Sequence, residues 1–185
     1  MKNNKLDRST TGLLVIDIQD RLFPYIERSS EMMHAVKIIV EGFKILNLPI
    51  FVSEQVPEKM GKTLLELRHI VQEEVYSYFS KTTFSCLGSE YFQKIINGGI
   101  IKQWILIGIE THVCVLQTAR DLIRLNQDVV VLNDATSSRS IYDYSTAIAE
   151  IRDCGGRVSS VETVLFELLS DSSVPEFKQI SRLIK

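Results

Sequence analysis

Residues 104–115 of the chain read WILIGIETHVCV, and this stretch decides the fold. Its first half, WILIGI (104–109), is the most strand-like segment of the sequence, an apolar run typical of strands buried on both faces. The apolar residues that follow recur at helical spacing and mark one face of a helix: Val115, Leu116, Ala119, Leu122 and Ile123. The stretch therefore predicts a buried strand that leads within a few residues into a helix.

The same alternation of apolar runs and helical patterns continues on both sides of this unit. Further strands are predicted at residues 13–17, 49–53, 75–80, 129–132 and 157–161. Helices are predicted at residues 31–47 (capped by Ser29 or Ser30), around 64–67, at 89–97 and along 147–154, and the tail from Pro175 onward is compatible with another. Pro57 and Gly61 mark a loop.

This order of elements predicts the architecture. Strands separated by helices pair in parallel through right-handed crossovers. We therefore predict a Rossmann-like three-layer α/β/α sandwich with a six-stranded, mainly parallel sheet. No linker or internal repeat interrupts the pattern, so we expect a single domain over residues 1–185.

The composition excludes several classes of protein. The 185 residues are 45% hydrophobic and 24% charged with a net charge of −2, which is typical of a soluble globular protein and not of a nucleic-acid binder. No apolar run approaches the ~20 residues that span a bilayer, so no membrane partner is expected. The start, MKNNKLDRST (1–10), lacks the apolar core of a signal peptide. Three cysteines are too few for a disulfide framework, so we expect free thiols in the cytoplasm.

Three reactive side chains, Asp17, Lys81 and Cys114, fall at or just past the predicted carboxyl ends of strands, where sites form in such sheets. Cys114 lies in the opening turn of a helix, whose dipole should lower the pKa of its thiol, and a nearby Lys81 ammonium would lower it further. An Asp17 carboxylate could take the thiol proton and pass it to a leaving group. Backbone N–H groups of the same turn could bind an oxyanion.

Simpler interpretations exist for each of these residues. A lone Cys is more often a packing residue, Asp17 could cap a turn, and Lys81 could lie on the surface. The site hypothesis is favoured because all three meet at one edge of the sheet. Cys86 and Cys154 have no such setting, and Cys154 is expected in the core. The three histidines, His34, His69 and His112, are far apart and lack the spacing of metal ligands, so no metal is expected. Nucleotide-binding glycine motifs are missing as well, so no cofactor is expected.

Four segments resemble the isochorismatase-like cysteine hydrolases, above all the small isochorismatase domain-containing proteins. They are LLVIDIQDRLF (13–23), FSKTTFSCL (79–87), GIETHVCV (108–115) and NDATSSR (133–139), in order within residues 10–170. The resemblance implies an Asp-Lys-Cys triad with Asp17 as general base, Lys81 as cationic partner and Cys114 as nucleophile.

The resemblance also implies the surroundings of that triad. It implies a cis peptide bond between Ile109 and Glu110, which would turn the Glu110 N–H toward the Cys114 N–H to form an oxyanion hole. Gln19 and Phe23 match positions that line the substrate pocket.

The sequence departs from the family pattern in two places. The segment SEQVPEK (53–59) lacks the Asp-x-His metal cluster of nicotinamidases, which argues against a zinc-dependent nicotinamidase. Glu110 replaces a small residue, and its charge should disfavour an anionic substrate unless Lys81 or another cation offsets it or Glu110 points away and pairs locally.

Three hypotheses of function follow. The first is a cysteine hydrolase that cleaves a C–N bond of a small amide or carbamoyl-type substrate through a thioester. The second is vinyl-ether hydrolysis of the isochorismatase type, in which Asp17 protonates the substrate. The third is a non-catalytic homologue that acts through protein contacts, for which SSRSIYDY (137–144) and the tail offer surfaces. Apart from a small-molecule substrate, the resemblance implies a homo-oligomer.

Overall fold

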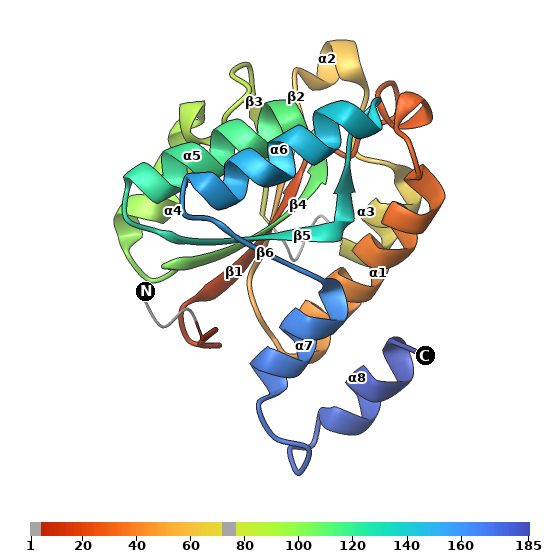
Figure 1. Cartoon of the computed structure of the whole chain (residues 1–185), viewed down its shortest axis with the longest axis vertical. Helices are drawn as coiled ribbons and strands as arrows, with labels where there is room; N and C mark the ends of the chain where they lie inside the picture. The colour runs from red at the N-terminus through yellow and green to blue at the C-terminus, as the bar shows by residue number, and fades with distance from the viewer. Residues whose placement is uncertain (1–4, 72–76) are drawn as a thin grey trace.

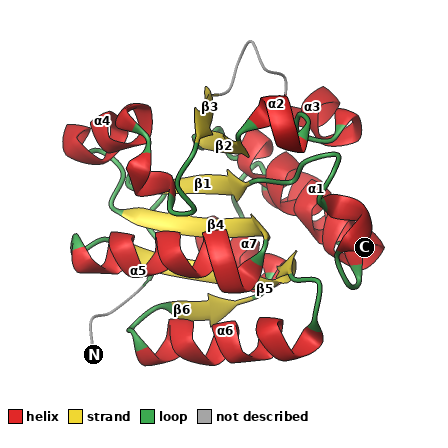
Figure 2. Ribbon diagram, turned by 90° about the horizontal axis from the view of Figure 1, so that it is seen from above, coloured by secondary structure: helices red, strands yellow, loops and turns green. Residues whose placement is uncertain are grey.

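The computed structural model describes residues 5–71 and 77–185. In this part of the chain a parallel sheet forms the middle layer, with helices on either side (Figure 1). Six strands are found among these residues: β1 (Thr11–Ile16), β2 (Ile50–Gln55), β3 (Ser77–Lys81), β4 (Gln103–Ile109), β5 (Asp128–Ser137) and β6 (Arg157–Ser159). All neighbouring strands pair in parallel, in the order β3-β2-β1-β4-β5-β6 (Figure 2). This is the Rossmann order, with the strand order reversing beside β1.

Helices cover both faces of the sheet. The described residues form α1 (Ser29–Ile45), α2 (Pro57–Met60), α3 (Leu65–Val71), α4 (Glu90–Gly98), α5 (Leu116–Arg124), α6 (Ile141–Asp153), α7 (Val161–Leu169) and α8 (Phe177–Leu183). One apolar core lies between the sheet and α1 and α7 and extends to α3 and α8, which pack against α1, and the other lies between the sheet and α4, α5 and α6. The predicted three-layer α/β/α sandwich is confirmed.

The continuous apolar run of β1 follows from these two cores. Leu13 and Val15 point into the core under α1, whereas Leu14 and Ile16 point into the core under α4 and α5. A strand in the middle of such a sheet has no solvent face, so its sequence cannot alternate between apolar and polar residues.

Several predicted boundaries need correction. Neither Ser29 nor Ser30 caps α1, because the helix begins at Ser29 itself, after Arg28 in a left-handed conformation. A short helix, α2, begins where Pro57 predicted only a loop. The predicted strand at 75–80 is found from Ser77 onward, and its first two positions lie outside the described residues.

Two corrections concern the last third of the chain. β5 continues to Ser137, well past the predicted end at residue 132, because the polar Asn133 and Asp134 interrupt its apolar pattern without ending the strand. β6 ends at Ser159 and is followed by α7, which the sequence analysis missed. Cys154 is half-buried, not in the core.

Gly108 allows a close approach between β1 and β4, and we expect Gly108→Ala to destabilise the protein strongly. Its φ is +111°, and a Cβ there would lie 2.1 Å from the carbonyl oxygen of Ile16. We expect the substitution to lower the free energy of unfolding by about 3 kcal/mol or more, measured by chemical denaturation.

Gly98→Ala is the matched control. Gly98 ends α4, and a Cβ there meets nothing within 4 Å. We expect this variant to unfold within about 1 kcal/mol of the parent. Equal denaturation midpoints for the two variants would contradict the role given to Gly108.

Candidate active site

The carboxyl ends of β1, β3 and β4 bring Asp17, Lys81 and Cys114 together. Asp17 directly follows β1, Lys81 is the last residue of β3, and Cys114 lies in a π-helical turn (Thr111–Val115) between β4 and α5. The Lys81 Nζ lies 2.7 Å from Asp17 Oδ2 and 3.7 Å from Cys114 Sγ. The ammonium thus links a carboxylate and a sulfur that are nearly one hundred positions apart in the sequence.

Lys81 is a buried cation surrounded by acceptors. Besides Asp17, its Nζ donates to Gln55 Oε1 at 2.7 Å and to the carbonyl oxygens of Thr83 and Phe84 at 3.2 and 3.0 Å. Burial by itself favours the neutral amine, but the negative charge of Asp17 and its hydrogen bond to Nζ oppose this effect, and the pKa of Lys81 is raised. Lys81 therefore keeps its positive charge beside the sulfur.

Asp17 is held on both carboxylate oxygens. Oδ2 accepts from Lys81, and Oδ1 accepts from the Ser53 hydroxyl at 2.7 Å. The backbone N–H of Asp17 also donates to the Ser53 carbonyl oxygen at 3.2 Å. These contacts fix the orientation of the carboxylate, which is a requirement for a group that transfers protons.

The expected low pKa of the Cys114 thiol is not found. The side chain is only 6% exposed, and burial first, then the negative charge of Asp17, raise the pKa of Cys114, while Lys81 opposes them without compensating. The prediction was wrong because it counted the helix start and the lysine but not the depth of burial, and because it treated the Asp17 carboxylate as a proton acceptor and not as a charge that raises the pKa of the thiol. The resting sulfur is therefore a thiol, which needs a base to become a nucleophile.

We expect slow alkylation of Cys114 at neutral pH. Because its pKa is raised, the thiolate fraction at pH 7 is small, and iodoacetamide should modify Cys114 at least about tenfold more slowly than it modifies glutathione. The rate should still climb above pH 9. Peptide mass spectrometry distinguishes Cys114 from Cys86, whose pKa burial raises to about 11, and from the half-buried Cys154. Rapid labelling that levels off below pH 8 would contradict this description.

Glu110 faces the site and is paired at the same time. The peptide bond between Ile109 and Glu110 is cis, as the resemblance implied. The Glu110 carboxylate is buried and accepts from the backbone N–H of Arg139 at 3.0 Å and from its Nε at 3.1 and 3.2 Å. The cation that could offset Glu110 is thus Arg139, from the turn between β5 and α6.

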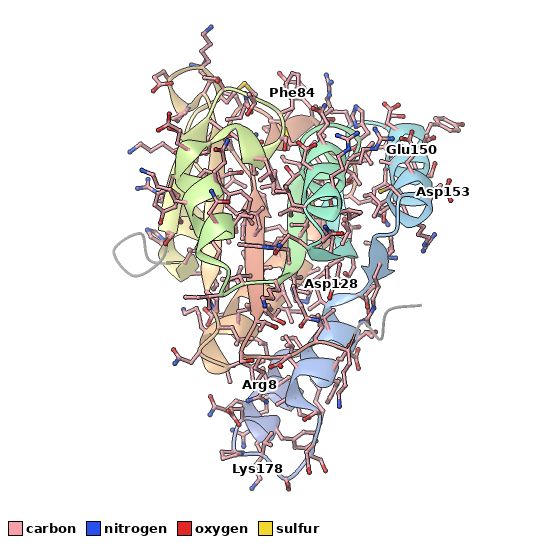
Figure 3. The ribbon with its side chains drawn as sticks, turned by 90° about the vertical axis from the view of Figure 1, so that its left-hand side faces the viewer. Arg8, Phe84, Asp128, Glu150, Asp153 and Lys178 are labelled. Carbon is pink, nitrogen blue, oxygen red and sulfur yellow. The ribbon has the colours of Figure 1, made fainter. Side chains whose placement is uncertain are left out.

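A cavity of about 400 Å³ opens onto these residues. Its polar lining comes from Asp17, Gln55, Lys59, Glu110, Cys114 and Arg139, and its apolar lining comes from Leu22, Val56, Met60, Phe84 and Val113. Phe84 is 54% exposed and lies near the top of the molecule in Figure 3. Figure 1 shows α2 at the same end of the molecule. The volume is at the lower end of the range for small-molecule sites.

Gln19 and Phe23 do not line this cavity, which corrects the expectation for both. The Gln19 amide is buried and bonds to backbone: its Nε2 donates to the carbonyl oxygens of Gln55 (3.1 Å) and Gly61 (2.6 Å), and its Oε1 accepts from the Gln55 N–H (2.8 Å). Phe23 packs against the core on the α1 face, and its neighbour Leu22 lines the cavity instead. Gln19 therefore holds the segment that carries Gln55.

Of the eleven residues that line the cavity, eight were not among the predicted site residues, and Gln55 and Arg139 are two of these. Gln55 is the last residue of β2, so the rule that placed Asp17 and Lys81 at strand ends could have found it. Arg139 ends the NDATSSR segment, which was used only for the resemblance.

His112, two residues before Cys114, is held by a local contact. The Nδ1 of His112 lies 3.0 Å from the Ser138 hydroxyl. Residues 5–71 and 77–185 contain no cluster of three or more His, Cys, Asp or Glu side chains suited to a metal ion. None of the helices in the same residues is long and apolar enough to cross a membrane.

The isochorismatase domain family matches residues 11–163. The chain belongs to the isochorismatase family. Among its relatives, a secreted isochorismatase effector of Phytophthora sojae is 37% identical, over 94% of this chain and 83% of the relative. Isochorismatase domain-containing protein 1 of Danio rerio is 34% identical over 97% of this chain, which spans only 62% of that protein. The expected family and the hydrolase class are confirmed.

Solved structures show the same isochorismatase-like fold. The MAR1 ribonuclease of Caenorhabditis elegans superposes with a TM-score of 0.92 at 30% identity, covering 97% of this chain and 92% of that one. YcaC of Escherichia coli, described as an octameric hydrolase of unknown specificity, superposes with a TM-score of 0.87 over 98% of this chain and 97% of that one. At 20% identity, this second likeness shows the fold alone.

Proposed function

We propose that this isochorismatase-family protein is a cysteine hydrolase that cleaves a C–N bond of a small amide or carbamoyl-type substrate through a thioester on Cys114. One observation carries the proposal: a thiol and a carboxylate that line a cavity of about 400 Å³ are both in contact with one buried ammonium, that of Lys81. Cys114 and Asp17 both line the cavity, so a bound substrate can contact the sulfur and the carboxylate at once. This is the arrangement that an activated nucleophile requires.

In the first half of the reaction, Asp17 takes the thiol proton as Sγ attacks the carbonyl carbon. A C–S bond forms, and the π electrons of the carbonyl move to its oxygen. We assign the backbone N–H groups of Glu110 and Cys114 as the oxyanion hole that binds this oxygen. When the intermediate collapses, the C–N bond breaks and the nitrogen takes the proton from Asp17, leaving as ammonia or an amine.

In the second half, water hydrolyses the thioester. Asp17 takes a proton from the water while the water oxygen attacks the carbonyl carbon. Asp17 then gives this proton to the sulfur as the C–S bond breaks. Lys81 keeps its charge throughout, because its five contacts hold it as an ammonium between Asp17 and the sulfur. Its role in the proposal is electrostatic and positional.

Vinyl-ether hydrolysis is the second candidate, because Asp17 itself lines the cavity and could protonate a substrate directly. In that reaction Cys114 is dispensable and Asp17 is not. The two routes therefore differ in the behaviour of Cys114→Ala, which should retain vinyl-ether cleavage and lose amide cleavage.

The experiment that tests the proposal traps the thioester. The protein is incubated with a panel of small primary amides, and ammonia release is measured with and without hydroxylamine. A thioester should transfer its acyl group to hydroxylamine, so the hydroxamate should appear with the parent protein and not with Cys114→Ala. Ammonia release that survives in Cys114→Ala would remove this mechanism, and a complete lack of turnover over the panel would favour the non-catalytic hypothesis.

We further propose a homo-oligomer, supported by the octameric state described for YcaC, which shares the fold. Light scattering coupled to gel filtration should give a mass at least twice the 21.1 kDa of one chain. A location in the cytoplasm stays a prediction. The Phytophthora sojae relative is named a secreted effector. The single domain over residues 1–185 also stays a prediction.

A further inference from the structure

Val56 has a backbone conformation that its side chain disfavours. It lies between β2 and α2 with φ +36° and ψ +67°, in the left-handed region. A β-branched residue rarely adopts this conformation, because its Cβ comes too close to a backbone oxygen. Pro57 follows, and the residue before a proline is favoured in an extended conformation. Val56 is therefore strained on two counts.

Backbone hydrogen bonds hold Val56 in place in spite of this strain. Its N–H donates to the carbonyl oxygen of Lys81 at 3.0 Å, which ties it to the end of β3. Its own carbonyl oxygen accepts from the N–H groups of Lys59 at 2.8 Å and Met60 at 3.0 Å, which ties it to α2. Strain of this kind persists where the surrounding structure fixes it, and it gathers at functional sites. The side chain of Val56 therefore has a fixed place beside the cavity that contains Cys114, the substrate cavity of the proposed reaction.

A second cavity, of about 380 Å³, lies at the end of β3 and the starts of α2 and α4. Of the described residues, Val56 alone lines both this second cavity and the substrate cavity. Gln55, directly before it, lines the substrate cavity, and Pro57, directly after it, lines the second cavity. The chain therefore passes from one cavity to the other at Val56, and this residue forms part of the wall between them.

The second cavity is negatively charged. Glu58 and Glu90 line it, and their carboxylates form no hydrogen bond or ion pair with any other residue of the described part. Lys81 lines it as well, but its side chain is fully buried and its ammonium binds Asp17. The hydroxyl-bearing residues of the lining are Ser80, Thr82 and Ser89. A ligand that enters this cavity is therefore favoured if it has a cationic end.

From this arrangement we propose that Val56 is a specificity-determining residue, which closes the substrate cavity toward the second cavity and limits the substrate to an amide with a short acyl chain. This inference rests on the proposed function for the choice of an amide. Glycine adopts the left-handed conformation without strain, so Val56→Gly keeps the backbone and removes only the wall. In that variant a longer acyl chain extends past residue 56, and an ammonium at its end reaches Glu58 or Glu90.

The first test compares amides of two lengths. Butyramide has a short acyl chain, and 6-aminohexanamide has a longer one that ends in an ammonium. In the parent protein, kcat/KM for butyramide should exceed that for 6-aminohexanamide by at least about tenfold. In Val56→Gly this ratio should fall by at least about tenfold, mainly through KM of the longer amide. An unchanged ratio in Val56→Gly, with both amides turned over, would overturn the role of Val56 and leave the cysteine hydrolase intact.

Hexanamide separates the length of the acyl chain from its charge. It is as long as the acyl chain of 6-aminohexanamide but has no ammonium, so its gain from Val56→Gly should be smaller by at least about threefold. That difference should shrink in Val56→Gly/Glu58→Gln, which removes one of the two carboxylates. Equal gains for the two longer amides would contradict entry into the second cavity.

Ser170→Gly is the matched control. Ser170 follows α7 with a φ of +58° and lines neither cavity, so this variant also places a glycine at a left-handed position. The preference for butyramide should be the same as in the parent protein. A ratio that falls as far as in Val56→Gly would mean that relief of backbone strain, and not the missing wall, admits the longer amide.

Binding measurements test the wall without turnover. In calorimetry, 6-aminohexanamide should bind at least about tenfold more tightly to Cys114→Ala/Val56→Gly than to Cys114→Ala. Circular dichroism checks that both variants are folded. Equal affinity for the two variants, or no binding to either, would overturn the role of Val56 whatever the outcome for hydrolysis.

Discussion

Cys114→Ala should reduce the hydrolysis of the amide substrate by at least about 10³-fold in kcat, because the sulfur forms the covalent bond that divides the reaction into two steps. The loss should appear in kcat more than in KM, since Cys114 is one of eleven residues that line the cavity and the others still bind substrate. Steady-state ammonia release measures both constants. The substitution removes only the sulfur atom, so the fold should persist.

Cys154→Ala is the matched control for this variant. Cys154 is the half-buried residue that follows α6 and does not line the cavity, so its loss should leave hydrolysis at the parental rate. Amide turnover that persists in Cys114→Ala, or falls equally in both variants, would contradict a nucleophilic role for Cys114.

The sheet and its site-bearing edge could be predicted because they depend on patterns that lie close together in sequence. A buried parallel strand needs a continuous apolar run, as in WILIGI (104–109), and parallel pairing then places the carboxyl ends of the strands at one edge. Asp17 and Lys81 were found by their position at that edge alone. The residues between β4 and α5 placed Cys114 there as well.

The remaining features depend on contacts between distant segments, which no local pattern encodes. The role of Gln19 is set by Gln55 and Gly61, more than thirty residues away. The resemblance indicated a pocket-lining role for Gln19, whereas its amide binds backbone groups of these two residues. The partner of Glu110 is Arg139, from another strand–helix turn. The direction of the Cys114 pKa shift depends on the depth of burial and on the Asp17 carboxylate, both results of the tertiary structure.

Asp17→Asn should change two reactions of Cys114 in opposite directions. Hydrolysis of the amide should fall by at least about 10³-fold, because asparagine can neither accept the thiol proton nor return it to the leaving nitrogen. Alkylation of Cys114 by iodoacetamide at pH 7 should become faster than in the parent. The reason is that, after burial, the Asp17 charge is the next largest cause that raises the pKa of Cys114, and the variant removes this charge.

Ser53→Ala separates the charge of Asp17 from its orientation. This variant removes the hydrogen bond to Oδ1 and keeps the carboxylate, so hydrolysis should fall by about tenfold only and alkylation should not accelerate. Circular dichroism must show that Asp17→Asn is folded, since Lys81 then lacks its buried counter-charge; the asparagine oxygen still offers it an acceptor of the same size. If Asp17 served only to hold Lys81, both reactions would slow together. A faster alkylation shows that the sulfur remains reactive in Asp17→Asn, so a lost hydrolysis in the same variant is then due to the missing proton acceptor and not to a damaged nucleophile.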